Sequence, residues 1–460
     1  MKLTLLLFFS VFTAVAQSIS GKILETETNE PIEFVNIYIE KIENGTTSNE
    51  KGEFNLKLNK KIKSRETIRF SKIGFTTISY TSSELEQLDF VVHLSKKTEK
   101  LSEVTVTSNK KLDSKVPYEK LSSIKKGIHH FGSAVVDNKI YVIGGDESLI
   151  IDTAKKVLNE VSMNPIAGME DFIKEYRSNL SWERYSNKLQ TYDIENDSWS
   201  ISNLKFRKRA YHKTIYINNK LYVLGGKTLS PNQKFQYLDA KIEVFDLKTK
   251  EIVVDDMNPH QAINFTAVSY QDNIVVMGGS NKLKRNGEKI YSDKNHIYNI
   301  TSGYWYELPQ MTKPKEANGI MANEKIYLIG GSNDMPLTEI ESYDLSSGKW
   351  KKEGDLFYGI ENPALAYNNN IIYIFSSNKI LTFHTTTKVL NEYKIGISEK
   401  DAQMYFHKEK LYILGGDVDF DFSNVPSSTL YAIDIKSFEN TEISNSTTYL
   451  QKNNIQAIIN

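Results

Sequence analysis

The feature that most constrains this chain is a short hydrophobic string that ends in two glycines and recurs along the sequence. The strings are IYVIGG, LYVLGG, IVVMGG, IYLIGG and LYILGG, and their first glycines are Gly144, Gly225, Gly278, Gly330 and Gly415. Successive glycines are 81, 53, 52 and 85 residues apart, and IIYIFSS marks a hidden unit within the last gap. Six units with one long insertion indicate a repeat architecture with the period of a propeller blade, about 40 to 50 residues.

Each unit also carries two bulky residues seven positions apart, on either side of a turn such as ENDS or LSSGK. The pairs are Tyr192 and Trp199, Phe245 and Ile252, Tyr298 and Trp305, Tyr343 and Trp350, Phe383 and Leu390, and Tyr431 and Phe438. This spacing predicts two adjacent antiparallel strands whose large side chains pack between sheets. The glycine pair follows a hydrophobic strand, where residues without Cβ let the strand bend and allow neighbouring backbone to approach.

These features, over about residues 129–443, resemble the kelch repeat. The resemblance implies a six-bladed β-propeller, because a four-stranded blade cannot bury both of its faces alone and must stack in a ring. We expect the propeller at residues 121–445, with an insertion at 145–188 and a C-terminal tail at 446–460. Closure of the ring needs strands from both ends of the propeller in one blade. The sequence leaves open whether PYEKLSSI, near Pro117, completes the sixth sheet.

Residues 17–95 alternate apolar and polar residues in IEFVNIYIEK, GEFNLKL, ETIRFSKIGFTTISY and LDFVVHL. This period of two predicts half-buried antiparallel strands and a small β-sandwich. The segment resembles the carboxypeptidase regulatory-like domain, a transthyretin-like sandwich that is an accessory module in exported proteins. The resemblance rests on the spacing of Gly21, Pro31, Gly45, Thr46, Gly52, Phe54 and Gly74. The expected fold class is therefore all-β, a small β-sandwich followed by a six-bladed kelch β-propeller.

The first residues, 1–16, have the pattern of a secretory signal peptide. Lys2 precedes an apolar run, and Ala14-Val15-Ala16 offers a cleavage site before Gln17. The alternative, an uncleaved anchor, is disfavoured because the run is shorter than the roughly 20 residues that span a bilayer. We expect an exported protein, secreted or periplasmic, with association with the outer membrane or cell envelope as an option. No transmembrane segment is expected in the mature chain.

Residues 96–120 are polar and rich in lysine around LSEVTVTS at 101–108, and we interpret them as a linker with a short strand-forming segment. Two interpretations remain open for that segment. It adds to the edge of a partner's sheet, or it is an ordinary linker strand packed on the neighbouring domain.

Composition excludes several function classes. Lys and Arg number 57, as do Asp and Glu, so there is no positive excess to favour nucleic acid as a partner. The absence of cysteine excludes disulfides, zinc-thiolate sites and a catalytic thiol. No HExxH, P-loop, GxGxxG or GxSxG motif occurs. We predict no cofactor and no metal.

Two clusters of potential metal-ligating residues do not change that prediction. Asp417, Asp419 and Asp421 alternate as in the first half of a calcium loop, but Phe422 stands where such a loop needs glycine. We interpret this run as a solvated acidic loop. His129 and His130 are adjacent in an expected strand, where they point to opposite faces and cannot share one ion.

Polar residues that precede the innermost strands are candidates for a ligand site at the mouth of the central channel. They are His129, Arg209, His212, Asn264, Asn318, Asn362 and Gln403. A ring of such residues suits a polyhydroxylated ligand, although the same groups also cap strand ends and bind channel water in any propeller. Kelch enzymes include copper radical oxidases, which a chain without cysteine cannot match, and sugar mutarotases. The mutarotase alternative requires Arg209 and His212 to face a cavity.

The insertion at 145–188 is the second candidate site, because loops on one face of a repeat fold usually carry recognition. Phe172, Ile173, Tyr176 and Leu180 recur at helical spacing and predict one amphipathic helix. The partner-binding candidates are Phe172, Tyr176, Trp182 and Tyr185. Alternatively, these aromatic residues cover a small core within the insertion. A basic loop with Lys282, Lys284 and Arg285 is interpreted as solubilising.

The sequence thus favours an exported, non-catalytic binding protein that recognises a protein or cell-envelope glycan through its propeller loops. The alternative is a sugar mutarotase or isomerase that acts in the channel. Neither the partner's identity nor the oligomeric state follows from the residues.

Overall fold

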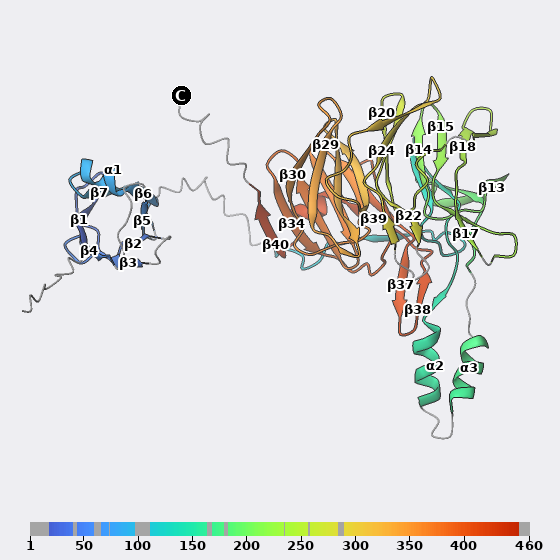
Figure 1. The fold of residues 1–460 in the computed structure, drawn as a ribbon, viewed down its shortest axis with the longest axis horizontal. Helices are drawn as coiled ribbons and strands as arrows, with labels where there is room; N and C mark the ends of the chain where they lie inside the picture. The colour runs from blue at the N-terminus through green and yellow to red at the C-terminus, as the bar shows by residue number, and fades with distance from the viewer. Residues whose placement is uncertain are drawn as a thin grey trace, which may run out of the picture. The chain divides into compact units, whose positions relative to one another are not determined.

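The computed structural model describes residues 18–39, 44–58, 66–72, 74–96, 111–162, 168–178, 183–233, 235–255, 258–283 and 289–449. The chain divides into two compact units, residues 1–110 and 111–460 (Figure 1). The expected signal peptide and the strand-forming segment at 101–108 lie outside the described residues. Within the described ranges, no helix is long and apolar enough to cross a membrane.

The first unit is a β-sandwich of two sheets. One sheet contains β1 (Ser18–Glu25), β4 (Glu53–Lys57) and β7 (Val91–Leu94). The other contains β2 (Asn36–Ile39), β3 (Asn44–Thr47), β5 (Thr67–Ser71) and β6 (Ile78–Thr81), and helix α1 (Ser82–Gln87) follows β6. Both sheets alternate buried and exposed residues, and the rings of Phe54 and Phe70 meet between them at 5.7 Å. The predicted sandwich is confirmed.

The described part of the second unit forms six blades in a ring. Blade 1 is β9 (Gly132–Val136), β10 (Lys139–Ile143), β12 (Lys188–Asp193) and β13 (Ser198–Lys205). Blade 2 is β14 (Lys213–Ile217), β15 (Lys220–Leu224), β18 (Ile242–Asp246) and β19 (Ile252–Asp255). Blade 3 is β20 (Thr266–Tyr270), β21 (Asn273–Met277), β24 (Asn295–Asn299) and β25 (Tyr304–Leu308).

The remaining blades repeat this order. Blade 4 is β26 (Glu316–Ala322), β27 (Lys325–Asn333), β29 (Glu339–Asp344) and β30 (Lys349–Asp355). Blade 5 is β31 (Ala364–Asn368), β32 (Ile371–Ser376), β33 (Lys379–His384), β34 (Val389–Lys394) and β40 (Asn445–Thr448). Blade 6 is β35 (Gln403–His407), β36 (Lys410–Leu414), β39 (Leu430–Asp434) and β8 (Glu119–Leu121). The 3₁₀ helix η2 (Ile435–Asn440) follows β39.

The glycine pairs and five of the six bulky pairs have the structural roles that the sequence indicated. In the sixth pair the prediction is wrong, because Phe438 lies in the 3₁₀ helix η2 and Tyr431 pairs with Lys120 of β8. Tyr192 and Trp199 are direct cross-strand partners of β12 and β13, and their rings lie 5.2 Å apart. Gly225 has φ of +69°, and a Cβ there would lie 2.5 Å from the ring of Phe265 in the next blade. The glycine pair therefore permits close packing of neighbouring blades.

The ring is closed by residues that precede the first blade. Strand β8 pairs with β39 and is the fourth strand of blade 6, so the PYEKLSSI segment does complete the sixth sheet. Val116, expected in the linker, is buried and its amide donates to the carbonyl oxygen of Lys394 at 2.8 Å. At the other end, β40 includes residues that we expected in the tail, and it adds a fifth strand to blade 5.

The connections after the second strands of five blades form the loop face. Its described residues are 146–162, 168–178, 183–187, 227–233, 235–241, 280–283, 289–294, 332–338 and 417–429. It carries β11 (Ile150–Ile151), α2 (Thr153–Ser162), α3 (Met169–Ser178), β16 (Lys227–Leu229), β17 (Gln236–Leu238), β22 (Ser280–Leu283), β23 (Lys289–Tyr291), β28 (Met335–Pro336), β37 (Asp417–Phe420) and β38 (Ser423–Pro426). Figure 1 shows the β37–β38 hairpin and helices α2 and α3 projecting from the same side of the propeller.

The loop face differs from expectation in two ways. The insertion contains two helices where one was predicted, and β11 pairs with β38, so the insertion is held by a hairpin of blade 6. The acidic run at Asp417 is not a solvated loop, because Asp417 and Asp419 belong to strand β37 and Asp417 is only 5% exposed.

We expect closure by β8 to determine the stability of the propeller. A Val116→Asp substitution places a carboxylate against the buried side chain of Ile395 and its neighbours, and should destabilise the propeller by about 3 kcal/mol or more. Thermal unfolding and limited proteolysis of residues 111–126 test this expectation. Leu112→Asp is the control, because Leu112 is 48% exposed and its substitution should change stability by less than about 0.5 kcal/mol. Equal melting temperatures for the two variants would contradict the expectation.

Candidate functional site

Two cavities lie on the axis of the ring. The mouth cavity, of about 210 Å³, is lined by His130, Tyr211, Asn264, Lys289, Glu316, Ala317, Glu361, Asn362 and Asp401. The inner cavity, of about 130 Å³, is lined by Phe131, Gly132, Ser133, Lys213, Thr214, Ile215, Ala267, Asn318, Gly319, Pro363, Ala364, Leu365 and Gln403. Each cavity receives residues from all six blades, which places both on the central axis.

The register of the innermost strands decides which residues reach the axis. One residue near the start of each inner strand pairs with the residue just before the glycine pair or its equivalent. These residues are Gly132, Lys213, Thr266, Asn318, Ala364 and Gln403. All but Thr266 line the inner cavity. Residues two positions earlier, such as His130, Asn362 and Asp401, line the mouth cavity. Of the residues in between, Phe131, Ala317 and Pro363 also border a cavity, whereas His212, Phe265 and Ala402 line neither.

Four of the seven predicted channel residues lie on the axis, at two different depths. Asn264 and Asn362 line the mouth cavity, and Asn318 and Gln403 line the inner cavity. His129, Arg209 and His212 line neither axial cavity. His212 is one residue before its inner strand, where the period of two turns a side chain toward the adjacent blade. His129 and Arg209 lie three and four residues before theirs, beyond the residues that line the mouth cavity.

A chain of hydrogen bonds connects the two cavities. The ammonium group of Lys213 donates to Asn318 Oδ1 at 2.7 Å, and Asn318 Nδ2 donates to Asn362 Oδ1 at 2.6 Å. Asn362 Nδ2 in turn donates to Asp401 Oδ1 at 2.7 Å. Burial lowers the pKa of Lys213 to about 8. Burial also raises the pKa of Asp401, although the hydrogen bond from Asn362 opposes that effect. The sequence analysis did not identify Lys213 or Asp401.

Aromatic rings form one wall of the mouth cavity. The rings of His130 and Tyr211 are stacked with centroids 4.0 Å apart, and Lys227 Nζ lies 4.4 Å from the centroid of Tyr211. Burial, then the nearby charges of His129 and Lys227, hold the pKa of His130 well below its ordinary value, so its ring is neutral at pH 7. His130 Nε2 lies 3.9 Å from Asp401 Oδ2.

Arg209 is part of a buried ion-pair network in blade 2. Its side chain is fully buried, and Nη2 lies 2.8 Å from Glu243 Oε2 and 3.3 Å from Asp239 Oδ2. Arg207 Nε donates to the same Asp239 oxygen at 2.9 Å. Burial raises the pKa of Glu243 even though Arg209 opposes that shift. The geometry assigns Arg209 a structural role.

The two other predicted histidines are also enclosed by protein. His212 Nε2 lies 3.0 Å from the carbonyl oxygen of Ile143 and 3.1 Å from the amide nitrogen of Gly132. Burial lowers the pKa of His129 to about 4, and its Nε2 is 4.0 Å from Asp146 Oδ1. Among the described residues, no group of three or more His, Asp or Glu side chains is placed to hold a metal ion.

The loop face carries a polar groove beside the ring. The groove has a volume of about 630 Å³ and lies between the end of the insertion and the β16–β17 hairpin; its lining includes Glu147, Arg184, Tyr185, Lys208 and Gln233. Tyr185 was predicted as an exposed anchor, but it is only 4% exposed and its hydroxyl donates to Glu183 Oε2 at 2.9 Å.

The other predicted partner-binding residues lie on α3 or close after it. Phe172 is half-buried, Tyr176 is exposed, and their rings are 6.1 Å apart. Trp182, Lys284 and Arg285 lie outside the described residues, as does the side chain of Lys282.

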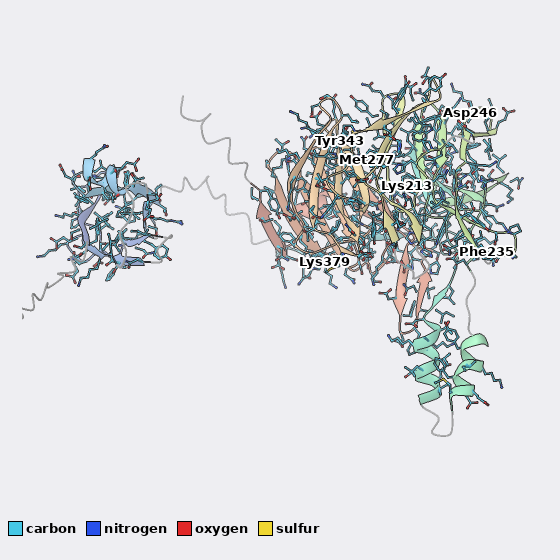
Figure 2. All side chains as sticks on the ribbon, viewed as in Figure 1. Lys213, Phe235, Asp246, Met277, Tyr343 and Lys379 are labelled. Atoms are coloured by element: carbon cyan, nitrogen blue, oxygen red, sulfur yellow. The ribbon has the colours of Figure 1, made fainter. Side chains whose placement is uncertain are left out.

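Large apolar side chains are exposed along the loop face, and sequence periodicity did not identify most of them. They are Leu149, Leu158, Met169, Ile173, Tyr176, Phe235, Tyr237, Met335 and Phe420. Figure 2 shows Phe235 on the side of the propeller from which α2 and α3 project. Phe235, Tyr237, Met335 and Phe420 lie in short loop hairpins without an extended pattern, so periodicity gave no signal for them.

Comparison with known proteins identifies both parts of the chain. The family model of the KLHDC2/KLHL20/DRC7 Kelch-repeats domain matches residues 178–376, and that of the CarboxypepD_reg-like domain matches residues 19–106. Kelch repeat and BTB domain-containing protein 2 of cowpox virus is 25% identical over 160 residues, which are 34% of this chain and 28% of that protein. N-(sulfonatooxy)prop-2-enimidothioate sulfolyase of Thlaspi arvense is 24% identical over 207 residues, which are 40% of this chain and 58% of the enzyme.

The chain therefore covers less than two thirds of either curated relative. Among solved structures, that of YjhT aligns with 67% of this chain and 96% of its own, with a TM-score of 0.49 and 12% sequence identity.

The buried network around Arg209 predicts a pH-dependent loss of stability. Arg209→Met leaves the carboxylates of Asp239 and Glu243 buried without their shared cation, so we expect a loss of about 3 to 5 kcal/mol at pH 7. The loss should be smaller at pH 5. The folded variant takes up a proton on Glu243 at a higher pH than the unfolded chain does, and this uptake favours the folded state as pH falls.

Urea unfolding at the two pH values measures this difference. Arg207→Met serves as the control, since the Arg207 side chain is 36% exposed and its pair with Asp239 should contribute about 1 kcal/mol or less. An equal loss for Arg209→Met at pH 5 and pH 7 would refute the explanation.

Substitution of Lys213 is expected to increase the stability of the fold, in contrast to substitution of Arg209. Because the pKa of Lys213 is lower in the folded state than in the unfolded state, the charged form costs stability below pH 8. Lys213→Met should therefore raise the free energy of unfolding at pH 7 by about 1 to 2 kcal/mol. At pH 10 the gain should be less than half as large, because the folded state is then deprotonated and only the remaining protonation of the unfolded state costs stability. Chemical denaturation of both proteins at each pH tests this, and a less stable variant at pH 7 would show that Lys213 is favourably paired.

Proposed function

We propose that this protein, which carries a kelch-repeat propeller and a CarboxypepD_reg-like domain, is an exported binding protein without catalytic activity whose propeller loops recognise a protein partner. Kelch propellers are generally protein-interaction scaffolds, and repeat folds commonly bind through loops on one face. The proposal of export rests on the leader at residues 1–16.

The observation that carries the proposal is the set of exposed apolar side chains on the loop face. Leu158, Met169, Phe235, Met335 and Phe420 are between 59% and 72% exposed. A single exposed apolar residue is common on protein surfaces, whereas several on neighbouring loops are typical of an interaction surface. Burying each on a partner contributes roughly 1.5 to 3 kcal/mol before the costs of association.

A protein partner explains these residues better than the glycan that the sequence also allowed. Apolar and aromatic anchors beside a polar groove match the composition of protein interfaces, in which aromatic residues and methionine are enriched. The groove beside the insertion provides Glu147, Arg184 and Lys208 as charged groups at the edge of such a surface.

The catalytic alternative requires Arg209 and His212 to face a cavity. Arg209 and His212 line neither axial cavity, and both are engaged with neighbouring protein groups. This placement favours binding over a mutarotase or isomerase reaction.

Replacement of Phe235 and Phe420 by serine tests the proposed surface. We expect the mature chain, residues 17–460, to capture a protease-sensitive partner from envelope and culture fractions, and the double variant to lose at least about nine tenths of that capture. Removing two exposed rings should leave the melting temperature unchanged, because neither side chain is part of the core.

Tyr304→Ser with Tyr306→Ser is the matched control, since these tyrosines are 67% and 55% exposed on β25, away from the loop face. If only the control variant lost capture, the binding surface would lie on the outer strands and not on the loop face. Capture of a protease-resistant species would support a glycan instead.

A further inference from the structure

The inner cavity contains a cation without an anion. Lys213 is the only ionisable residue among those that line it. In the described part of the chain, its ammonium group donates to Asn318 and forms no ion pair within 4.0 Å. A charged group in a partly buried channel is costly unless an opposite charge or several hydrogen bonds accompany it.

Other donors face the same cavity without protein acceptors. Thr214 Oγ1 is buried and has no hydrogen-bond partner among the described residues. The side-chain amide of Gln403 also has no partner in the described structure, and the hydroxyl of Ser133 accepts from Tyr405 at 2.6 Å, which leaves its own proton free to be donated. An ammonium group and three further donors, with no carboxylate, form a site for a monoanion.

The mouth cavity has the opposite charge. Asp401 faces the neutral ring of His130, and Glu361 is exposed and forms no ion pair within 4.0 Å in the described structure, although the charge of Lys289 lies near it. Glu316 is neutralised by Lys289, whose Nζ lies 2.9 Å from Oε2. Carboxylates at the mouth disfavour a simple anion on its way to Lys213, but they attract a cation.

The geometry points to a ligand with both charges. We propose that the channel binds a small zwitterion of amino-acid size, with its carboxylate against Lys213 and its cationic group at Asp401. The two cavities adjoin, since Asn318 of the inner cavity and Asn362 of the mouth are hydrogen-bonded at 2.6 Å. Their volumes of about 210 and 130 Å³ are below the roughly 300 to 1,000 Å³ of sites for drug-sized ligands, so they suit a small molecule.

This site is separate from the proposed partner surface. Figure 2 places Lys213 within the propeller, whereas the exposed apolar residues lie on the loop hairpins and insertion helices. The channel can therefore bind its ligand whether or not the loop face binds a protein.

Ligand-observed NMR titrations of the mature chain test the site with three matched probes at pH 7. The probes are 4-aminobutyrate, which has both charges, butyrate, which has only the carboxylate, and butylamine, which has only the ammonium. We expect 4-aminobutyrate to bind at least about tenfold more tightly than butyrate, and butylamine to bind most weakly of the three. A failure of 4-aminobutyrate to bind at tens of millimolar would overturn the proposal.

Two variants test which residue binds each charged end of the ligand. Lys213→Met should lower the affinity for both 4-aminobutyrate and butyrate at least about tenfold, because each carboxylate loses its hydrogen bond from the charged ammonium group. Asp401→Asn should reduce the affinity for 4-aminobutyrate toward that of butyrate and leave butyrate unchanged. Asparagine suits this position, where φ is +51°.

The control is Lys410→Met, since Lys410 is an exposed lysine at the start of β36, paired loosely with Glu119. It should bind all three probes as the wild type does. Unchanged binding by Lys213→Met, or equal binding of butylamine and 4-aminobutyrate, would overturn the proposal. A melting temperature at or above that of the wild type shows that Lys213→Met is folded.

Discussion

The pairing of β8 with β39 is the interaction on which the propeller depends. A ring of blades has a free edge unless its last sheet receives a strand from the other end of the propeller. Here that strand comes from residues 119–121, and its approach is fixed by Val116 in the core and by Tyr118, whose hydroxyl donates to the carbonyl of Gly396 at 2.9 Å. Blades 1 and 6 are also joined on the loop face, where β11 in the insertion of blade 1 pairs with β38 in the hairpin of blade 6. Closure therefore also fixes the insertion that we propose as part of the binding surface.

The fold could be predicted from the sequence because its signals are local and repeated. A hydrophobic strand and two bulky residues seven positions apart recur in each blade, and five blades have a glycine pair. Blade 5, where the register places Ser376 and Ser377 at the glycine positions, keeps the spacing of the bulky residues. The site could be predicted only in part. Asn362 was identified, whereas Lys213 and Asp401 were missed. Lys213 directly follows the predicted His212, and a shift of one residue turns a side chain from the axis to the adjacent blade. Asp401 lies two residues before the predicted Gln403 and lines the axis at a different depth. That register is set by strand pairing, which composition does not report.

The insertion was harder to predict for a different reason. Its position followed from the irregular spacing of the glycines, but its contacts come from residues far away in the sequence. Tyr185 was expected to be exposed, yet the base of the insertion folds back onto blade 1, where Asp146 and Tyr185 form an isolated bridge. Helix α2 was also missed, although its sequence is as amphipathic as that of α3. The contacts at the base of the insertion depend on the tertiary fold and not on local periodicity.

Charged residues distinguish the walls of the propeller from its channel. Glu243 and Glu341 occupy equivalent positions in blades 2 and 4, and each accepts a buried cation, Arg209 at 2.8 Å and Lys315 at 2.5 Å. Pairing makes these charges tolerable between packed sheets. Lys213, in the inner strand β14 itself, has no such carboxylate. An unpaired charge that is costly to the fold, and that borders a cavity, is expected where a ligand supplies the missing partner. The contrast between the paired and unpaired cations therefore locates the binding chemistry on the axis.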